Sequence, residues 1–216
     1  MPSFSTNCKR CPRLAKFLEQ VRLTHPDYFA KPVPAFGDDN AQLCVVGLAP
    51  GMHGANATGR PFTGDHAGIL MYKTLYKYGF ATKKKSQAHD DLKLINCRIT
   101  NAVKCLPPHN KPLGIEINNC NQWLKLEFKL LPDNFVIMAL GLIAHKAVIK
   151  ALDLKQKEYI FSHGAEHRLN KGIIIDSYHC SRYNTQTGRL TSAMFEAVFK
   201  RAQELVTKDN CPEVSL

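Results

Sequence analysis

The stretch Leu43-Cys-Val-Val-Gly-Leu48, followed at once by Ala49-Pro50-Gly51, decides the fold of this 216-residue chain. The unbroken apolar run is typical of a parallel strand buried on both faces, and the proline and glycine predict a tight loop where it ends. Three more strands are expected, within 92–102, at 134–140 and at 172–176. Apolar residues at helical spacing predict helices at 13–23, 67–78, 115–131, 143–152 and 190–206. This alternation predicts an α/β fold: three α/β/α layers around a central, mostly parallel four-stranded sheet, with helices on both faces.

Composition limits the partners of the chain. Lys and Arg number 29 against 18 Asp and Glu, and the resulting net charge of +11 favours a polyanionic partner such as nucleic acid. No run of 18 apolar residues occurs, and the first residues do not form a leader, so we expect no membrane association. We expect one domain over 1–216 with a short polar tail from about 207, acting as a soluble monomer in a bacterial-type cytosol or nucleoid (cytoplasmic).

Three polar clusters follow predicted strands: 47–65, Thr100-Asn101 and 179–184. Ligands of open α/β sheets bind beyond the carboxyl ends of the strands. The clusters therefore predict where the functional site lies.

Four of the eight cysteines have spacing that suits a metal centre. Cys8 and Cys11 form a C-x-x-C pair, while Cys105 precedes a proline loop and Cys120 lies on a predicted helix. Four thiolates from two distant segments can close one site, which on chemistry alone suits zinc as well as an iron-sulfur cluster. A redox motif, or chance, is the competing interpretation. Two further cysteines are interpreted as small apolar core residues, Cys44 and Cys97.

Three blocks, taken together, carry a family resemblance. They are Gly47-Leu-Ala-Pro-Gly51 with Gly59-Arg-Pro-Phe-Thr-Gly-Asp65, then Ile99-Thr-Asn-Ala-Val-Lys-Cys105, and His179-Cys-Ser-Arg-Tyr-Asn-Thr-Gln-Thr-Gly-Arg-Leu190. In these blocks the chain resembles the iron-sulfur uracil-DNA glycosylases, and among them the type B, or family 5, branch. The resemblance implies a single glycosylase domain that flips a deaminated base out of DNA and hydrolyses its N-glycosidic bond, leaving an abasic site. The implied bases are uracil, hypoxanthine and xanthine.

The resemblance also implies a cofactor, a [4Fe-4S] cluster rather than zinc, held by Cys8, Cys11, Cys105 and Cys120. Two positions depart from related sequences. Cys180 stands where the family usually has proline, so the loop after His179 loses a ring that fixes φ. Leu48 stands where related branches carry an asparagine or an acidic residue, so the group that handles water must come from elsewhere.

Three residues receive catalytic roles on this basis. His179 is expected to stabilise the negative charge of the departing base, and Asp65 to position the attacking water. Asn101 is expected to read the hydrogen-bonding edge of the base. Two alternatives stay open: Asp65 as the N-cap of the helix from about 67, and Phe62, expected to stack on the base, as an ordinary core aromatic.

The predicted substrate-binding set combines the first block with the polar ends of the other strands. It comprises Gly47, Leu48, Ala49, Gly51, Phe62, Asn101, Ser181 and Arg182. Four basic side chains are predicted phosphate contacts, each with a solvated surface as the alternative: Arg60, Lys104, Lys111 and Arg189.

Competing functions are a non-catalytic iron-sulfur module for DNA binding or damage sensing, a bifunctional lyase and a metal-dependent nuclease. A lyase needs a desolvated lysine in the pocket, and none stands out in the three blocks. A nuclease needs clustered carboxylates, and the blocks supply only Asp65.

Overall fold

The computed structural model describes residues 4–208, which fold around a six-stranded sheet of order β1-β3-β2-β4-β6-β5. The strands are β1 (Phe36–Gly37), β2 (Leu43–Gly47), β3 (Cys97–Asn101), β4 (Phe135–Leu140), β5 (Glu166–Leu169) and β6 (Gly172–Ser177). The four inner strands run parallel, and β1 and β5 pair antiparallel at the two edges. The predicted parallel core is confirmed, but the predicted count of four strands is wrong because both edge strands were missed.

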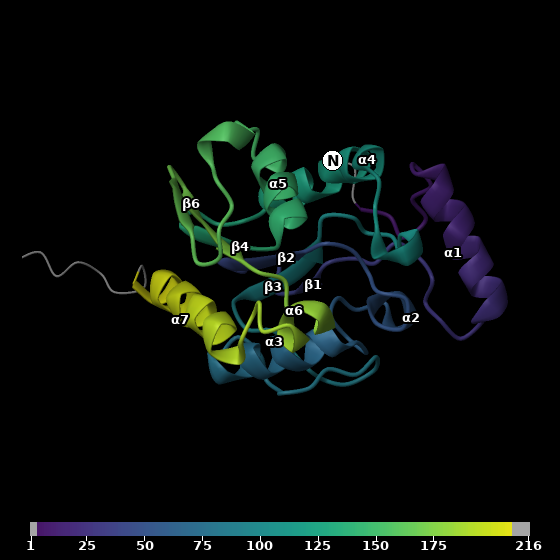
Figure 1. Ribbon diagram of the computed structural model, residues 1–216, viewed down its shortest axis with the longest axis horizontal. Helices are drawn as coiled ribbons and strands as arrows, with labels where there is room; N and C mark the ends of the chain where they lie inside the picture. The colour runs from purple at the N-terminus through teal and green to yellow at the C-terminus, as the bar shows by residue number, and fades with distance from the viewer. Residues whose placement is uncertain (1–3, 209–216) are drawn as a thin grey trace, which may run out of the picture.

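Helices cover both faces of the sheet, so the α/β/α layering is confirmed (Figure 1). The longer helices are α1 (Pro12–Thr24), α3 (His66–Lys77), α4 (Gly114–Phe128), α5 (Leu142–Ala151) and α7 (Ser192–Lys208). The short ones are α2 (Ala55–Thr58), α6 (Arg182–Gln186) and two 3-10 turns, η1 (Pro108–Asn110) and η2 (Gln156–Glu158). Helices α3 and α7 pack on one face and α4 and α5 on the other, while α1 packs against the segment after β3 and against α4.

The central strand β2 explains the apolar run that begins at Leu43. All five of its residues are buried, because helices cover both of its faces and it is hydrogen-bonded to a strand on each side. The chain passes from β2 to β3 on one side and later to β4 on the other. The carboxyl end of β2 is therefore a topological switch point, where such sheets leave a crevice for a ligand.

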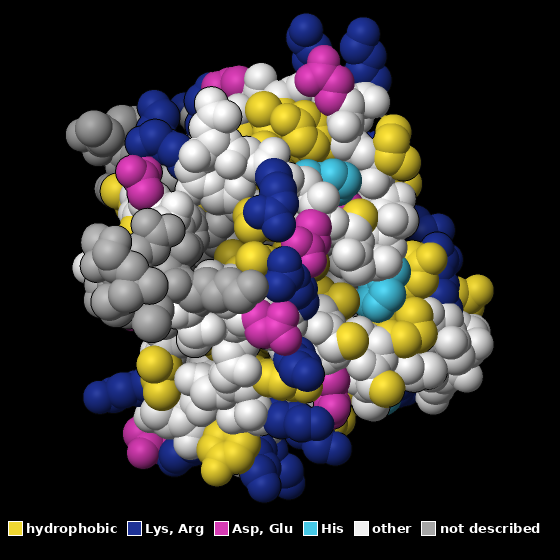
Figure 2. Space-filling model, turned by 90° about the vertical axis from the view of Figure 1, so that its left-hand side faces the viewer, with side chains coloured by type: hydrophobic (Ala, Val, Ile, Leu, Met, Phe, Trp, Pro, Cys, Tyr) yellow, Lys and Arg dark blue, Asp and Glu magenta, His cyan; other side chains and the backbone are white. Residues whose placement is uncertain are grey.

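The missed edge strand β5 is short and polar. Its sequence Glu166-His-Arg-Leu169 lacks the apolar run that marks a buried strand, and its residues are only partly buried. Figure 2 shows that this side of the molecule carries positive and negative side chains in close alternation, and Arg201 pairs with both Glu166 and Glu204. Charged side chains at a sheet edge discourage pairing with another chain.

Helix α7 continues through Lys208, so the part of the predicted polar tail beyond it lies outside the described residues. Within 4–208, no helix combines the length and the apolar character needed to cross a bilayer.

Candidate functional site

A cavity of about 520 Å³, open to solvent, lies at the carboxyl ends of β2, β4 and β6. Its walls come from the loop after β2, the start of α3, the turn from β4 into α5 and the segment after β6. This is the edge of the sheet at which the polar clusters predicted a site.

Asp65 lies in the cavity wall as the N-cap of α3. Its Oδ1 accepts the backbone N–H of Gly68 at 2.9 Å. Its Oδ2 faces the opposite loop, since a Cβ atom added at Gly54 would lie 2.5 Å from that oxygen. Burial raises the pKa of the Asp65 carboxyl, although the backbone N–H groups of Gly68 and Ala67 oppose the rise. Asp65 therefore caps helix α3, as the alternative interpretation predicted, and also places a carboxylate in the cavity wall.

His179 lies in the cavity wall just after β6. Asn184 Nδ2 donates to the carbonyl oxygen of His179 at 2.8 Å, which fixes the backbone of this segment. Burial lowers the pKa of the His179 imidazole to about 4, so the ring is neutral at neutral pH. Among the described residues, no hydrogen bond occupies its ring nitrogens, which leaves them available to a ligand.

Gly47, Phe62 and Asn101 are packed together behind the cavity wall. A Cβ atom added at Gly47 would lie 2.4 Å from Asn101 Oδ1 and 2.8 Å from the ring of Phe62, so only glycine allows this approach. The Phe62 ring in turn stacks on the His179 ring, with centroids 5.9 Å apart and planes at 27°. Phe62 is 6% exposed and belongs to the main core, as its alternative interpretation had it, yet it contacts the predicted catalytic histidine.

Asn101 ends β3 and is 4% exposed. Within the described part of the chain its side-chain amide makes no hydrogen bond, and Asn101 is not one of the residues that line the cavity. An unpaired amide beside the cavity can hydrogen-bond to a ligand.

The remaining predicted binding residues divide between the two sides of the cavity. Leu48, Ala49 and Gly51 line it from the β2 loop, and Ser181 and Arg182 line it from the α6 side. Ser181 is the N-cap of α6, where its Oγ accepts the backbone N–H of Asn184.

One wall of the cavity was not predicted. The segment from Leu140 to Ala144, where β4 turns into α5, lines the cavity with apolar side chains, and His66 and Asn110 line it elsewhere. The signal for this wall was the buried strand followed by Gly141, the same pattern that marked the β2 loop. Its apolar side chains gave no sign of chemistry.

Of the four predicted phosphate contacts, Lys104 is wrong and Arg60 has a partner inside the protein. Lys104 is 1% exposed, and its Nζ donates to both carboxylate oxygens of Glu127, at 2.8 and 2.9 Å. Arg60 pairs with Asp90 at 2.5 Å and lies over the ring of Phe36. Lys104 is therefore too deeply buried to reach a phosphate, whereas Arg60 is held by Asp90 with part of its side chain exposed.

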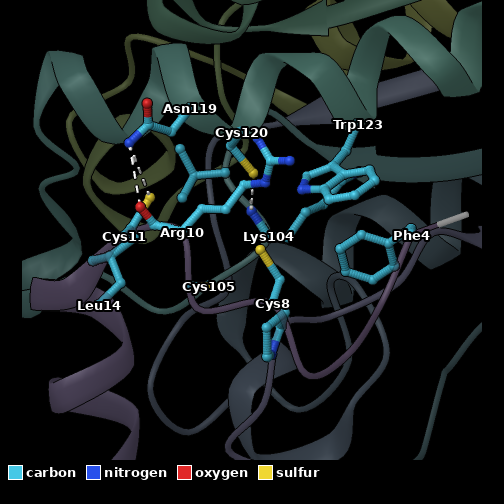
Figure 3. Close-up of a pocket in the computed structure, with 12 residues that line it drawn as sticks. Phe4, Cys8, Arg10, Cys11, Leu14, Lys104, Cys105, Asn119, Cys120 and Trp123 are labelled. Carbon is cyan, nitrogen blue, oxygen red and sulfur yellow. Dashed lines mark hydrogen bonds between the residues drawn. The ribbon is translucent and has the colours of Figure 1, made fainter. Parts of the chain in front are cut away.

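Four cysteines line a second, much smaller cavity on the α1 side of the molecule (Figure 3). They are Cys8 from the N-terminal segment, Cys11 at the start of α1, Cys105 after β3 and Cys120 on α4. The structure brings together all four cysteines predicted to share a site.

The surroundings of these cysteines suit a metal cluster with thiolate ligands. The backbone N–H of Lys104 donates to Cys120 Sγ at 3.2 Å, and Asn119 Nδ2 donates to Cys11 Sγ at 3.9 Å. Burial raises the pKa of the Cys120 thiol to about 11 and that of Cys105 further. Buried thiolates therefore need a bound cation, because the thiolate rather than the thiol is the metal ligand.

Four cysteines around one cavity are a donor set that suits a single metal ion with thiolate ligands as well as an iron-sulfur cluster.

The three other cysteines of the described residues 4–208 lie in the core, and Cys211 lies outside those residues. Cys44 and Cys97 are fully buried on β2 and β3, as expected. Cys180 is also fully buried, and its Sγ lies 3.6 Å from the carbonyl oxygen of Ala67. This contact ties the segment after His179 to the start of α3, where the family's usual proline would fix φ instead.

Known proteins resemble the chain over nearly its whole length. The family model of the uracil DNA glycosylase superfamily matches residues 34–203. A type-5 uracil-DNA glycosylase of Thermus thermophilus is 44% identical over 93% of this chain and 94% of its own. One from Pyrobaculum aerophilum is 41% identical over 91% of this chain and 88% of its own. A type-4 uracil-DNA glycosylase of Archaeoglobus fulgidus is 32% identical over only 57% of this chain and 55% of its own.

Proposed function

The chain belongs to the uracil DNA glycosylase superfamily, and from that membership we propose that it removes uracil from DNA as a monofunctional glycosylase. The observation that best supports this proposal is that His179 and Asp65 line the same cavity at the switch point of the sheet. The His179 imidazole is neutral, and its ring nitrogens make no hydrogen bond within the described residues. Water attacks the sugar, the N-glycosidic bond breaks, and an abasic site is left in the DNA.

The base must first leave the duplex, because its glycosidic bond cannot be reached inside the stack. The cavity at the end of β2 receives it. Asn101 offers an unpaired amide for the edge of the base, and the Leu48, Ala49 and Leu142 side chains form an apolar wall.

Bond cleavage places negative charge on the base and positive charge on the sugar. His179 is neutral, so a ring N–H can donate to the carbonyl oxygen where the negative charge collects. Asp65 Oδ2, turned away from the helix cap, can hold water near the sugar and favour its positive charge.

The proposal extends to other deaminated bases. Apolar Leu48 lines the cavity without a hydrogen-bonding group that would select one base, which suits hypoxanthine and xanthine as additional substrates. A pocket built to hydrogen-bond one substrate rejects others strongly, whereas an apolar wall discriminates weakly.

The DNA contact includes helix α6 at the mouth of the cavity. Arg182 lines the mouth, and Tyr183 beside it is 71% exposed, although large aromatic side chains are usually covered. Arg182 can meet a phosphate, and Tyr183 can fill the space that the flipped base leaves.

A [4Fe-4S] cluster held by Cys8, Cys11, Cys105 and Cys120 completes the proposal. It would supply a structural cross-link between the N-terminal segment, the loop after β3 and α4. Cys105 lies four positions after Asn101, so this link also steadies the end of β3. We place the protein in the bacterial-type cytosol or nucleoid, with its DNA, as a monomer.

The deciding experiment uses oligonucleotides that each carry one uracil, hypoxanthine or xanthine, followed by alkaline cleavage at abasic sites. We expect cleavage at uracil by the wild-type protein and a loss of cleavage with His179→Ala. Binding to uracil-containing DNA without any base release would instead support the non-catalytic module.

A further inference from the structure

Three side chains outside the candidate active site form a compact buried group. His145 comes from α5, His167 from β5 and Asp176 from β6. His145 Nδ1 lies 2.8 Å from Asp176 Oδ1, and His167 Nε2 lies 3.0 Å from Asp176 Oδ2. The three ligand atoms all lie within 4.8 Å of one another. The proposed glycosylase chemistry uses none of them.

The carbonyl oxygen of Tyr159 fixes the tautomer of His145. This oxygen can only accept, and it lies 3.0 Å from His145 Nε2, so Nε2 carries a proton and donates it. In a neutral imidazole, Nδ1 would then face the Asp176 carboxylate with its lone pair. Two electron-rich atoms do not stay 2.8 Å apart unless a second proton lies between them or both bind one metal ion.

The carboxylate of Asp176 needs this proton or metal ion because the group is buried away from water. Asp176 is fully buried and His145 is 1% exposed. A carboxylate so far from water must be paired or must coordinate a metal. The side chain of His167 is 12% exposed and is the part of the group through which an ion could enter.

We propose that His145 Nδ1, His167 Nε2 and the carboxylate of Asp176 bind a Zn²⁺ ion. Two imidazole nitrogens and a carboxylate are ligands that zinc takes readily in proteins. A zinc-bound histidine usually donates its other N–H to a carbonyl or carboxylate, which is the arrangement of His145 Nε2 with Tyr159.

The ion would join two walls of the active-site cavity. His145 follows directly on Ala144, which lines the cavity, and Asp176 precedes His179 by three positions on the same segment. A metal ion that links His145 of α5 to Asp176 of β6 would therefore stabilise both the apolar wall of the cavity and the segment that carries His179. The site itself does not depend on the glycosylase activity.

The test is zinc binding by the full chain with its iron content intact, after treatment with a mild chelator. Zn²⁺ is added back, and its affinity is measured by competition with a chromophoric chelator. We expect about one zinc ion per chain and a loss of affinity of at least roughly 100-fold in His167→Gln. His167 is on an edge strand, so this variant should keep its fold, which melting and iron content verify.

His89→Gln is the matched control, because His89 is exposed and distant in sequence from the group. It should bind zinc as the wild type does, and Asp176→Asn should lose zinc as His167→Gln does. Wild-type protein that takes up no stoichiometric zinc would overturn the proposal and leave a proton-bridged ion pair. Undiminished affinity in a folded His167→Gln would also overturn it, because the zinc would then lie on other groups.

Discussion

One oxygen of the Asp65 carboxylate accepts the backbone N–H of Gly68 at 2.9 Å, and the other oxygen faces the loop across the cavity. The same side chain therefore begins helix α3 and presents a carboxylate to the substrate. The two tasks can be separated, because asparagine caps a helix about as well as aspartate but has no negative charge.

Asp65→Asn should slow uracil release by roughly 100-fold or more, the lower end of what a positioned base contributes. It should leave the melting temperature nearly unchanged, because the cap survives. Release of hypoxanthine, the poorer leaving group, should suffer more. Asp65→Ala serves as the comparison, since it should slow release and also cost about 1 kcal/mol of stability. Full rates in Asp65→Asn, measured under single turnover, would leave Asp65 with the capping task alone.

His179→Ala should slow release by ~10²–10³-fold on every substrate, the loss expected for one donor to a developing anion, while binding of damaged DNA survives. Because the pKa of His179 is lowered to about 4, the wild-type rate should show no inflection from this ring near neutral pH. An inflection near the ordinary value, about 6.5, that disappears in the variant would contradict the neutral-donor role.

The lowered pKa of His179 should also make the stability of the folded protein depend on pH. The unfolded chain binds a proton at His179 near pH 6.5, whereas the folded chain does so only near 4. The unfolded state therefore gains protons first as the pH falls, and this ring contributes a loss of stability between about 6.5 and 4. Denaturant melts at several pH values should show a shallower acid slope in His179→Gln than in the control His89→Gln. Parallel slopes in the two variants would mean that His179 titrates normally in the folded protein.

The buried pair of Lys104 and Glu127 should behave as a structural unit. Lys104→Met leaves the Glu127 carboxylate buried without its partner, which should destabilise the protein by ~3–5 kcal/mol. The double variant Lys104→Met with Glu127→Leu should recover most of that loss, and denaturant unfolding measures all three proteins. The affinity for DNA should keep its salt dependence in the double variant. A weaker salt dependence of DNA affinity in the double variant would show that Lys104 contacts a phosphate after all, contrary to its burial in the structure.

The sequence predicted the parallel core because burial on both faces leaves a plain mark, an unbroken apolar run such as the one from Leu43 to Leu48. Edge strands carry no such mark. Strand β1 is only two residues long, and β5 is polar, so neither could be told from a loop before its pairing was known.

The sequence predicted the site residues that have reactive side chains, but not those that line the cavity with apolar side chains. Asp65 and His179 were placed correctly in one cavity, but the apolar turn into α5 was missed. The prediction for Lys104 was wrong because its partner Glu127 lies 23 positions away in the sequence. The charge of a lysine does not indicate whether it is exposed or buried with such a distant carboxylate.

The cysteines give the last prediction, because the chain contains matched controls for them. Cys105 and Cys97 are both buried, yet only Cys105 faces the cavity shared with Cys8, Cys11 and Cys120. Cys105→Ala should therefore lose the cluster, and with it the cross-link and much of the stability. Cys97→Ala should keep about four irons per chain and the broad visible absorbance of a [4Fe-4S] centre. Iron analysis, the visible spectrum and thermal melts compare the two variants directly. Equal iron in both, or colourless wild-type protein with zinc on these cysteines, would refute the cluster.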